Sequence, residues 1–84
     1  MSDERTQAPP MPDLADWNPL ATLSPRQYEV LSIAATGLTN TQVAQRLHLT
    51  THSIKFHLAE AYRKLGVSNR TEAAAVYHRY ARGA

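Results

Sequence analysis

Residues 39–66, TNTQVAQRLHLTTHSIKFHLAEAYRKLG, decide the fold because they encode two helices joined by a short turn. Thr39 and Gln42 have the three-residue spacing of a capping box, in which the two side chains satisfy free backbone N–H groups at a helix start. A short helix is therefore expected to begin here and to end near Leu47. Residues 48–50 then form the turn, and the histidine that opens it accepts a positive φ more readily than most residues do.

The second helix of this stretch is expected to run from a cap at Thr50 to Leu65, where Gly66 supplies the left-handed conformation that helix ends favour. At about 100° per residue, one narrow stripe of this helix is apolar and is assigned to the core. That stripe consists of Ile54, Leu58, Ala61 and Leu65. Two helices with a turn of this length are typical of a helix-turn-helix, whose second helix, here residues 51–65, enters the DNA major groove.

The opposite side of the 51–65 helix carries side chains that a core does not need. These are His52, Lys55, Phe56, Ala59 and Arg63. An exposed phenylalanine beside a lysine is explained if the ring meets thymine methyl groups while Lys55 reaches a guanine edge or a phosphate. A contact of Phe56 with a partner protein is the alternative, and it stays open at this point.

Hydroxyl and amide side chains gather at the beginnings of the two helices. Helix N-termini present free backbone N–H groups and the positive end of the helix dipole, both of which favour phosphate. The candidate DNA-binding residues at these positions are Thr39, Asn40, Thr41, Thr50, Thr51 and Ser53. Helix capping alone explains some of them, and both roles coexist only where the cap faces the DNA backbone.

Two further helices are expected on either side of this pair. Ser24 as N-cap, Pro25 at the first helical position and a glutamine two residues later predict a helix that ends near Thr36. Asn69 and Glu72 form the last capping box, which opens a helix to about Tyr80. No strand pattern competes, so the expected fold class is all-α with four helices.

Composition divides the chain near Thr22. All five prolines precede residue 26, which predicts a mostly disordered, acidic arm over residues 1–22 and a helical domain over residues 23–84. Residues 1–23 carry a net charge of −3 and residues 24–84 a net charge of +5, and a basic domain suits a polyanionic partner. The absence of cysteine excludes a disulfide framework and a thiolate zinc site.

The arm contains one apolar pattern, because Leu14, Trp17 and Leu20 recur at three-residue spacing. This segment is expected to dock either on the domain or on a partner. The N-terminus lacks the basic start and apolar run of a signal peptide, and no stretch approaches the roughly 20 apolar residues of a membrane span. A cytoplasmic protein without membrane contact is expected.

Four segments in the same order and spacing resemble the LuxR-type DNA-binding domain. They are LSPRQYEVL (23–31), GLTNTQVAQRL (37–47), SIKFHL (53–58) and RKLGVSNRTEA (63–73). The resemblance implies a bacterial transcription regulator that binds double-stranded DNA as a dimer. It also implies that residues 53–57 lie in the major groove, with Lys55 as a principal contact. Ala59 departs from the pattern, because many relatives carry a polar or basic DNA-contacting residue there, so a different affinity or base choice is expected.

The last helix presents two small or apolar edges. The first, Ala73, Val76, Tyr77 and Tyr80, is expected to pack on the domain, and the second is formed by Ala74, His78 and Ala81. In relatives this helix resembles a dimer interface, which predicts a homodimer whose recognition helices meet half-sites about one DNA turn apart. A monomer is the alternative. The sequence leaves open the operator, the controlling signal, and whether RNA polymerase is recruited or blocked.

Catalysis, cofactors and metals are not predicted. His48 and His52 have the spacing of a helical metal pair, but His48 lies in the turn and no carboxylate or thiolate joins them. Ser24, Ser53 and Ser68 have capping or groove explanations, and no glycine-rich loop is present to cradle a nucleotide phosphate. The chain is therefore not expected to be an enzyme.

Two other binding functions are alternatives to this one. The first is an interaction module with the same fold that pairs with a larger transcription regulator. The short chain and Trp17 favour this alternative. The second is a sigma-factor region that reads a promoter, which the segment at residues 63–73 disfavours.

Overall fold

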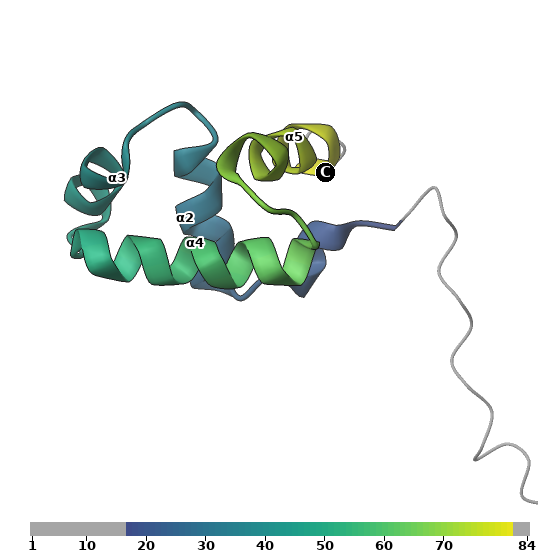
Figure 1. The fold of residues 1–84 in the computed structure, drawn as a ribbon, viewed down its shortest axis with the longest axis horizontal. Coiled ribbons are helices and arrows are strands. Elements are labelled where there is room, and N and C mark those ends of the chain that lie inside the picture. The colour runs from purple at the N-terminus through teal and green to yellow at the C-terminus, as the bar shows by residue number, and fades with distance from the viewer. Residues whose placement is uncertain (1–16, 82–84) are drawn as a thin grey trace, which may run out of the picture.

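The structure is a computed structural model that describes residues 17–81, so the expectations for residues 1–16 lie outside it (Figure 1). It contains a short 3-10 helix and four α-helices. They are η2 (Pro19–Thr22), α2 (Pro25–Ala34), α3 (Asn40–Leu47), α4 (Thr51–Leu65) and α5 (Arg70–Ala81). The described residues contain no strand, which confirms the predicted all-α fold with four α-helices. None of their helices is long and apolar enough to span a bilayer.

The first three α-helices begin where the capping pattern predicts. The side chains of Ser24 and Gln27 form both halves of a capping box at the start of α2. Thr39 and Gln42 do the same at α3. At α4, the Thr50 hydroxyl accepts a backbone N–H of the first turn. The helix starts are therefore set locally, by side chains that satisfy otherwise free N–H groups.

One capping bond and one helix end differ from the sequence prediction. At α5, Oδ1 of Asn69 accepts the N–H of Glu72 at 2.9 Å, as predicted, but the Glu72 carboxylate accepts the N–H of Ser68 at 2.7 Å rather than that of Asn69. Helix α2 ends at Ala34 rather than at Thr36. Its last turn tightens to bonds that span three residues. The Ala34 carbonyl accepts the N–H of Gly37 in this turn, and it accepts a second hydrogen bond from the guanidinium of Arg70.

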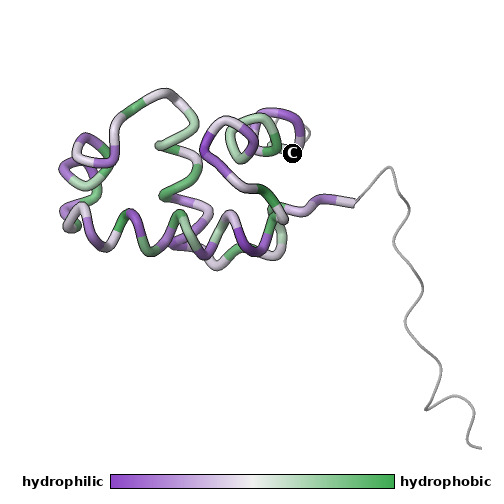
Figure 2. The backbone as a smooth tube through the Cα atoms, viewed as in Figure 1, coloured by the Kyte–Doolittle hydropathy of each residue, from purple (hydrophilic) through white to green (hydrophobic). Residues whose placement is uncertain are grey.

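Helix α4 lies along one side of the molecule, and α2, α3 and α5 pack on it (Figure 1). Its stripe is buried as predicted: Ile54 and Ala61 are fully buried and Leu58 is 4% exposed, while Leu65 is half-buried. Ile54 and Leu58 belong to one core with Val30, Leu31, Ala34, Val43 and Ala44, and Leu65 packs against it. Figure 2 shows hydrophobic and hydrophilic residues alternating along α4, as expected for a helix that packs on α2 with one side.

The short helix η2, which precedes Leu23, packs against α4 and α5. Leu20 of η2 is 2% exposed and belongs to the same core as α2 and α4. Trp17 packs edge-on against Tyr80, with ring centroids 5.7 Å apart, and remains 50% exposed. Trp17 therefore docks on the chain's own domain in this structure.

Residues of both predicted edges of α5 contact other parts of the same chain. Ala73 is fully buried, and Val76, Tyr77 and Tyr80 pack on the core, as predicted. The second edge is less free than the sequence suggests: His78 Nε2 lies 3.1 Å from the Ala35 carbonyl oxygen, and Ala81 packs against the core. The reason is that α5 crosses the end of α2. The outward-facing residues on α5 are Thr71, Glu72, Ala75, His78 and Arg79.

The turn between α3 and α4 depends on a left-handed residue, since His48 has φ 59° and ψ 41°. The N–H of Leu49 then reaches back to the Ala44 carbonyl at 2.9 Å and closes α3. His48 is exposed, so its side chain does not compensate for the backbone strain.

We predict that His48→Val lowers the free energy of unfolding by about 1–2 kcal/mol, because a β-branched residue is disfavoured in the left-handed region. His48→Gly should retain the stability of the wild type or exceed it by up to about 1 kcal/mol. Urea unfolding followed by circular dichroism measures both. A His48→Val protein as stable as His48→Gly would contradict this account of the turn.

Candidate nucleic-acid interface

The exposed side of α4 lies opposite its buried stripe and carries the residues predicted there. His52, Lys55, Phe56, Ala59 and Arg63 are all exposed. The structure therefore brings this predicted set together on one helix. The exposure of this set follows from the helical period of about 100° per residue, because its members lie outside the narrow stripe that the core buries.

Phe56 is the most exposed large hydrophobic side chain among the described residues, at 58%. Its one aromatic neighbour among the described residues is the ring of His57, in an edge-on arrangement with centroids 5.7 Å apart. A phenylalanine left in water makes no contribution to the core and adds apolar surface to a charged face. Its position suits a contact made with another molecule.

The cations on this helix differ in their surroundings. Lys55 forms no ion pair with a carboxylate among residues 17–81. Arg63 pairs with Glu60 one turn earlier, and this bond and charge hold the pKa of the Glu60 carboxyl below its usual value. Because the Arg63 pair is exposed, water and salt weaken it, and the guanidinium can exchange its partner for a phosphate.

The two helix N-termini place their polar side chains in different situations. The hydroxyls of Thr39 and Thr50 are committed to capping, since each accepts a backbone N–H. Thr41 is exposed, and Thr51 and Ser53 are half-buried at the start of α4.

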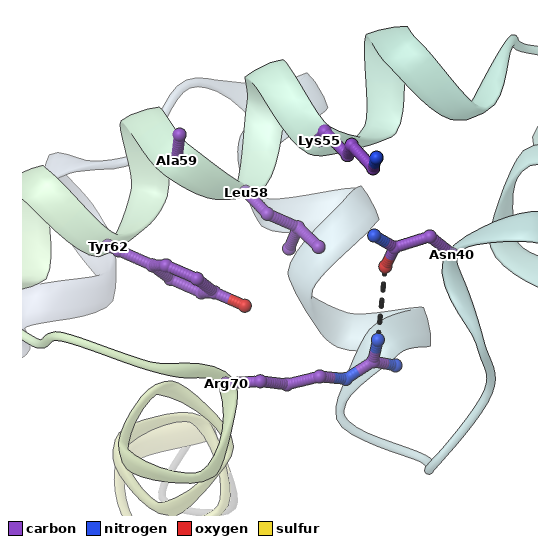
Figure 3. Close-up of a pocket in the computed structure, with 6 residues that line it drawn as sticks. All are labelled: Asn40, Lys55, Leu58, Ala59, Tyr62 and Arg70. Atoms are coloured by element: carbon purple, nitrogen blue, oxygen red, sulfur yellow. Dashed lines mark hydrogen bonds between the residues drawn. The ribbon is translucent and has the colours of Figure 1, made fainter.

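Asn40 lies beside α4, and its Oδ1 accepts a hydrogen bond from Arg70 at 3.1 Å. An open hollow of about 360 Å³ lies between Asn40 at the start of α3, Arg70 at the start of α5 and the side of α4 (Figure 3). Its lining residues from α4 are Lys55, Leu58, Ala59 and Tyr62. Burial raises the pKa of Tyr62, and the nearby Arg70 cation partly offsets this effect. The small side chain of Ala59 leaves this side of the hollow open.

Sequence reasoning missed Tyr62 and Arg70 as residues of this surface. Arg70 bonds to groups 30 to 36 positions earlier in the chain, a separation that periodicity and capping patterns do not reach. The available signal was an arginine next to the N-cap of α5, where a cation is not favoured by the helix dipole and so needs another explanation. Among the described residues, no three His, Cys, Asp or Glu side chains are grouped for a metal ion.

We predict that Phe56→Ala changes the free energy of unfolding by less than about 0.5 kcal/mol, because a surface side chain that contacts little loses little. The matched control on the buried stripe, Ile54→Ala, should cost about 2–5 kcal/mol. Urea unfolding of both variants tests this assignment of faces. A large loss of stability in Phe56→Ala would show that the ring packs in the folded chain.

The comparisons with known proteins match this domain to regulators. The family described as bacterial regulatory proteins, luxR family, matches residues 21–77. The chain is 43% identical over 65 residues to the "Probable transcriptional regulatory protein SgaR" of Hyphomicrobium methylovorum, covering 77% of this chain and 31% of the relative. It is 42% identical over 62 residues to the "Transcriptional activator protein BjaR1" of Bradyrhizobium diazoefficiens, covering 74% and 26%.

A third relative extends the match further along the chain. The "Two-component response regulator PprB" of Pseudomonas aeruginosa is 36% identical over 77 residues, which cover 86% of this chain and 28% of the relative. The chain thus spans less than a third of the length of these relatives. The similarity lies in the helical body that carries the exposed face of α4.

Proposed function

The chain belongs to the luxR family of bacterial regulatory proteins, and from this membership we propose that it binds specific DNA sequences with α4 in the major groove. As a domain of transcription regulators, it is a DNA-binding protein and not an enzyme. The observation that carries the proposed binding mode is the exposed Phe56 next to Lys55, on the side of α4 opposite the core.

In this binding mode α4 reads bases and the helix N-termini meet the DNA backbone. The ammonium of Lys55 donates to a guanine edge or to a phosphate, and the Phe56 ring packs on thymine methyl groups. His52 and Ala59 flank them on the same side of the helix. The groups assigned to phosphates are the side chains and N–H groups of Thr39, Asn40, Thr41, Thr51, Ser53 and Arg63.

The active form in this proposal is a homodimer that meets through α5. The outward face of α5 carries Ala75 between charged and polar residues. The contact between the two copies is therefore small, and binding to the same DNA reinforces it. Two-fold symmetry places the two copies of α4 in successive major grooves, about one helical turn apart. Such a pair acts in the cytoplasm, where it recruits or blocks RNA polymerase.

A second candidate function rests on the aromatic side chains around α5. Trp17 is 50% exposed beside Tyr80, and Tyr28 is 37% exposed beside Tyr77. Exposed aromatic surface is typical of protein–protein contacts. In this alternative the domain pairs with a larger regulator and modulates it, and α4 has no direct role.

We predict that Lys55→Ala and Phe56→Ala each weaken binding to a duplex selected from a random pool by about 1–3 kcal/mol, as expected for a base contact. If Lys55 meets only phosphate, its removal should instead flatten the salt dependence by about one unit for all sequences. Fluorescence anisotropy at two salt concentrations distinguishes these results. Binding that survives both substitutions would contradict the proposed mode and favour the interaction module.

The proposed dimer is tested at Ala75. We predict that Ala75→Glu lowers self-association and weakens binding to a two-half-site duplex more than to a single half-site, because two carboxylates would face each other across the two-fold axis. Analytical ultracentrifugation and anisotropy measure the two effects. Arg26→Glu, an exposed charge change on α2, is the control. An unchanged dimer in Ala75→Glu would show that the copies meet elsewhere or remain single.

A further inference from the structure

Arg70, the first residue of α5, forms hydrogen bonds with the end of α2 and the beginning of α3. Its guanidinium donates to the Ala34 carbonyl at the end of α2 at 2.8 Å and to the Leu38 carbonyl in the following loop. It also donates to Oδ1 of Asn40, the first residue of α3, at 3.1 Å. One side chain therefore fixes where α3 begins relative to α2 and α5.

The contact with Arg70 determines which way the Asn40 amide points. A guanidinium has only donors, so the amide must present its oxygen to Arg70 and turn its NH2 group away. In Figure 3 this NH2 group points into the hollow beside α4, toward the end of the Lys55 side chain. Without Arg70 the amide would be free to rotate and to present either atom.

The hollow thus receives donors from two helices. Among residues 17–81, the hydrogen bond with Arg70 is the one that the Asn40 side chain forms, and Lys55 has no carboxylate partner. An ammonium and an amide NH2 cannot bond to each other. Their convergence is explained by an acceptor from outside the chain, and one phosphate group has oxygens enough for both.

We propose that Arg70 is a positioning residue for DNA binding, which orients Asn40 so that its NH2 group and the Lys55 ammonium hold one backbone phosphate. This inference rests on the proposed function, because it takes DNA as the ligand and, of the two contacts proposed there for Lys55, takes the phosphate. Arg70 itself does not touch the phosphate and acts through Asn40. Its planar fork reaches three acceptors in fixed directions from two nitrogen atoms, whereas a lysine would have to reach them from one nitrogen.

Asn40→Asp separates this role from a purely structural one. The carboxylate accepts from Arg70 at least as well as the amide and is favoured at a helix N-terminus, so the melting temperature should stay equal or rise. The donor toward the hollow is lost, however, and a negative charge takes its place. Affinity for a labelled 30-base-pair duplex of random sequence should fall at least tenfold, as measured by fluorescence anisotropy with the full chain.

Gln45→Glu is the matched control, since it makes the same change of charge at an exposed position of α3 outside the hollow. It should weaken binding by less than about threefold, the effect expected of a screened charge. Equal losses in Gln45→Glu and Asn40→Asp would overturn the proposal, because the effect would then be one of net charge alone.

A double-mutant cycle tests whether Arg70 acts through Asn40. Asn40→Ala and Arg70→Lys should each lower the affinity for DNA by about three- to tenfold. The affinity of the double variant should be no lower than that of the single variant with the lower affinity. Losses that multiply would show that the two residues act separately and would overturn the positioning role. The melting temperature of each variant is measured alongside, so that loss of folding is recognised.

Two outcomes distinguish this inference from the function on which it rests. A wild-type protein that does not bind the duplex would overturn the proposed function and the inference with it. A wild-type protein that binds, together with an Asn40→Asp protein that binds equally well, would overturn the role of Arg70 and Asn40 alone.

Discussion

The apolar stripe of α4 packs on α2, and this burial determines which side of α4 the molecule presents to a partner. Ile54 and Ala61 are fully buried and Leu58 nearly so. Burial of a large apolar side chain such as Ile54 or Leu58 stabilises the fold by about 1.5–3 kcal/mol. A rotation of α4 that buried Phe56 would add one such contribution and remove the two from Ile54 and Leu58. The core therefore determines that Phe56 and its neighbour Lys55 are exposed. The proposed DNA-reading face is thus a consequence of packing on the opposite side.

The position of α3 beside this face depends on two further local constraints. The left-handed His48 closes α3 and turns the chain into the cap of α4. Arg70 then joins the loop before α3 to the beginning of α5 through the carbonyls of Ala34 and Leu38. A helix of eight residues has little stability of its own, so contacts at its two ends decide where it lies.

The sequence predicts most of this fold because its signals are local. The caps at Ser24, Thr39 and Thr50 and the left-handed Gly66 act within a few residues, and all four occur as predicted. The exposed face of α4 follows from the helical period together with the buried stripe.

The features that the sequence does not predict depend on contacts between distant residues. The apolar spacing that includes Leu20 predicts docking but leaves the partner open, and the place of Leu20 in the core depends on contacts of η2 with α4 and α5. The hollow beside α4 exists because Arg70 reaches the start of α3, and neither periodicity nor capping reports such a contact. The edge of α5 that contains His78 is apolar or small in sequence, yet it is partly occupied by the end of α2.

The most direct test of the account is an amide chemical-shift titration of the ¹⁵N-labelled protein with a duplex selected from a random pool. The account predicts that the largest shifts occur over the first turns of α4, residues 51–59, and at the beginning of α3, with small shifts in α2 and η2. Large shifts confined to α5 and the Trp17 indole, with α4 unchanged, would contradict it. They would locate the binding surface of this domain on its aromatic side.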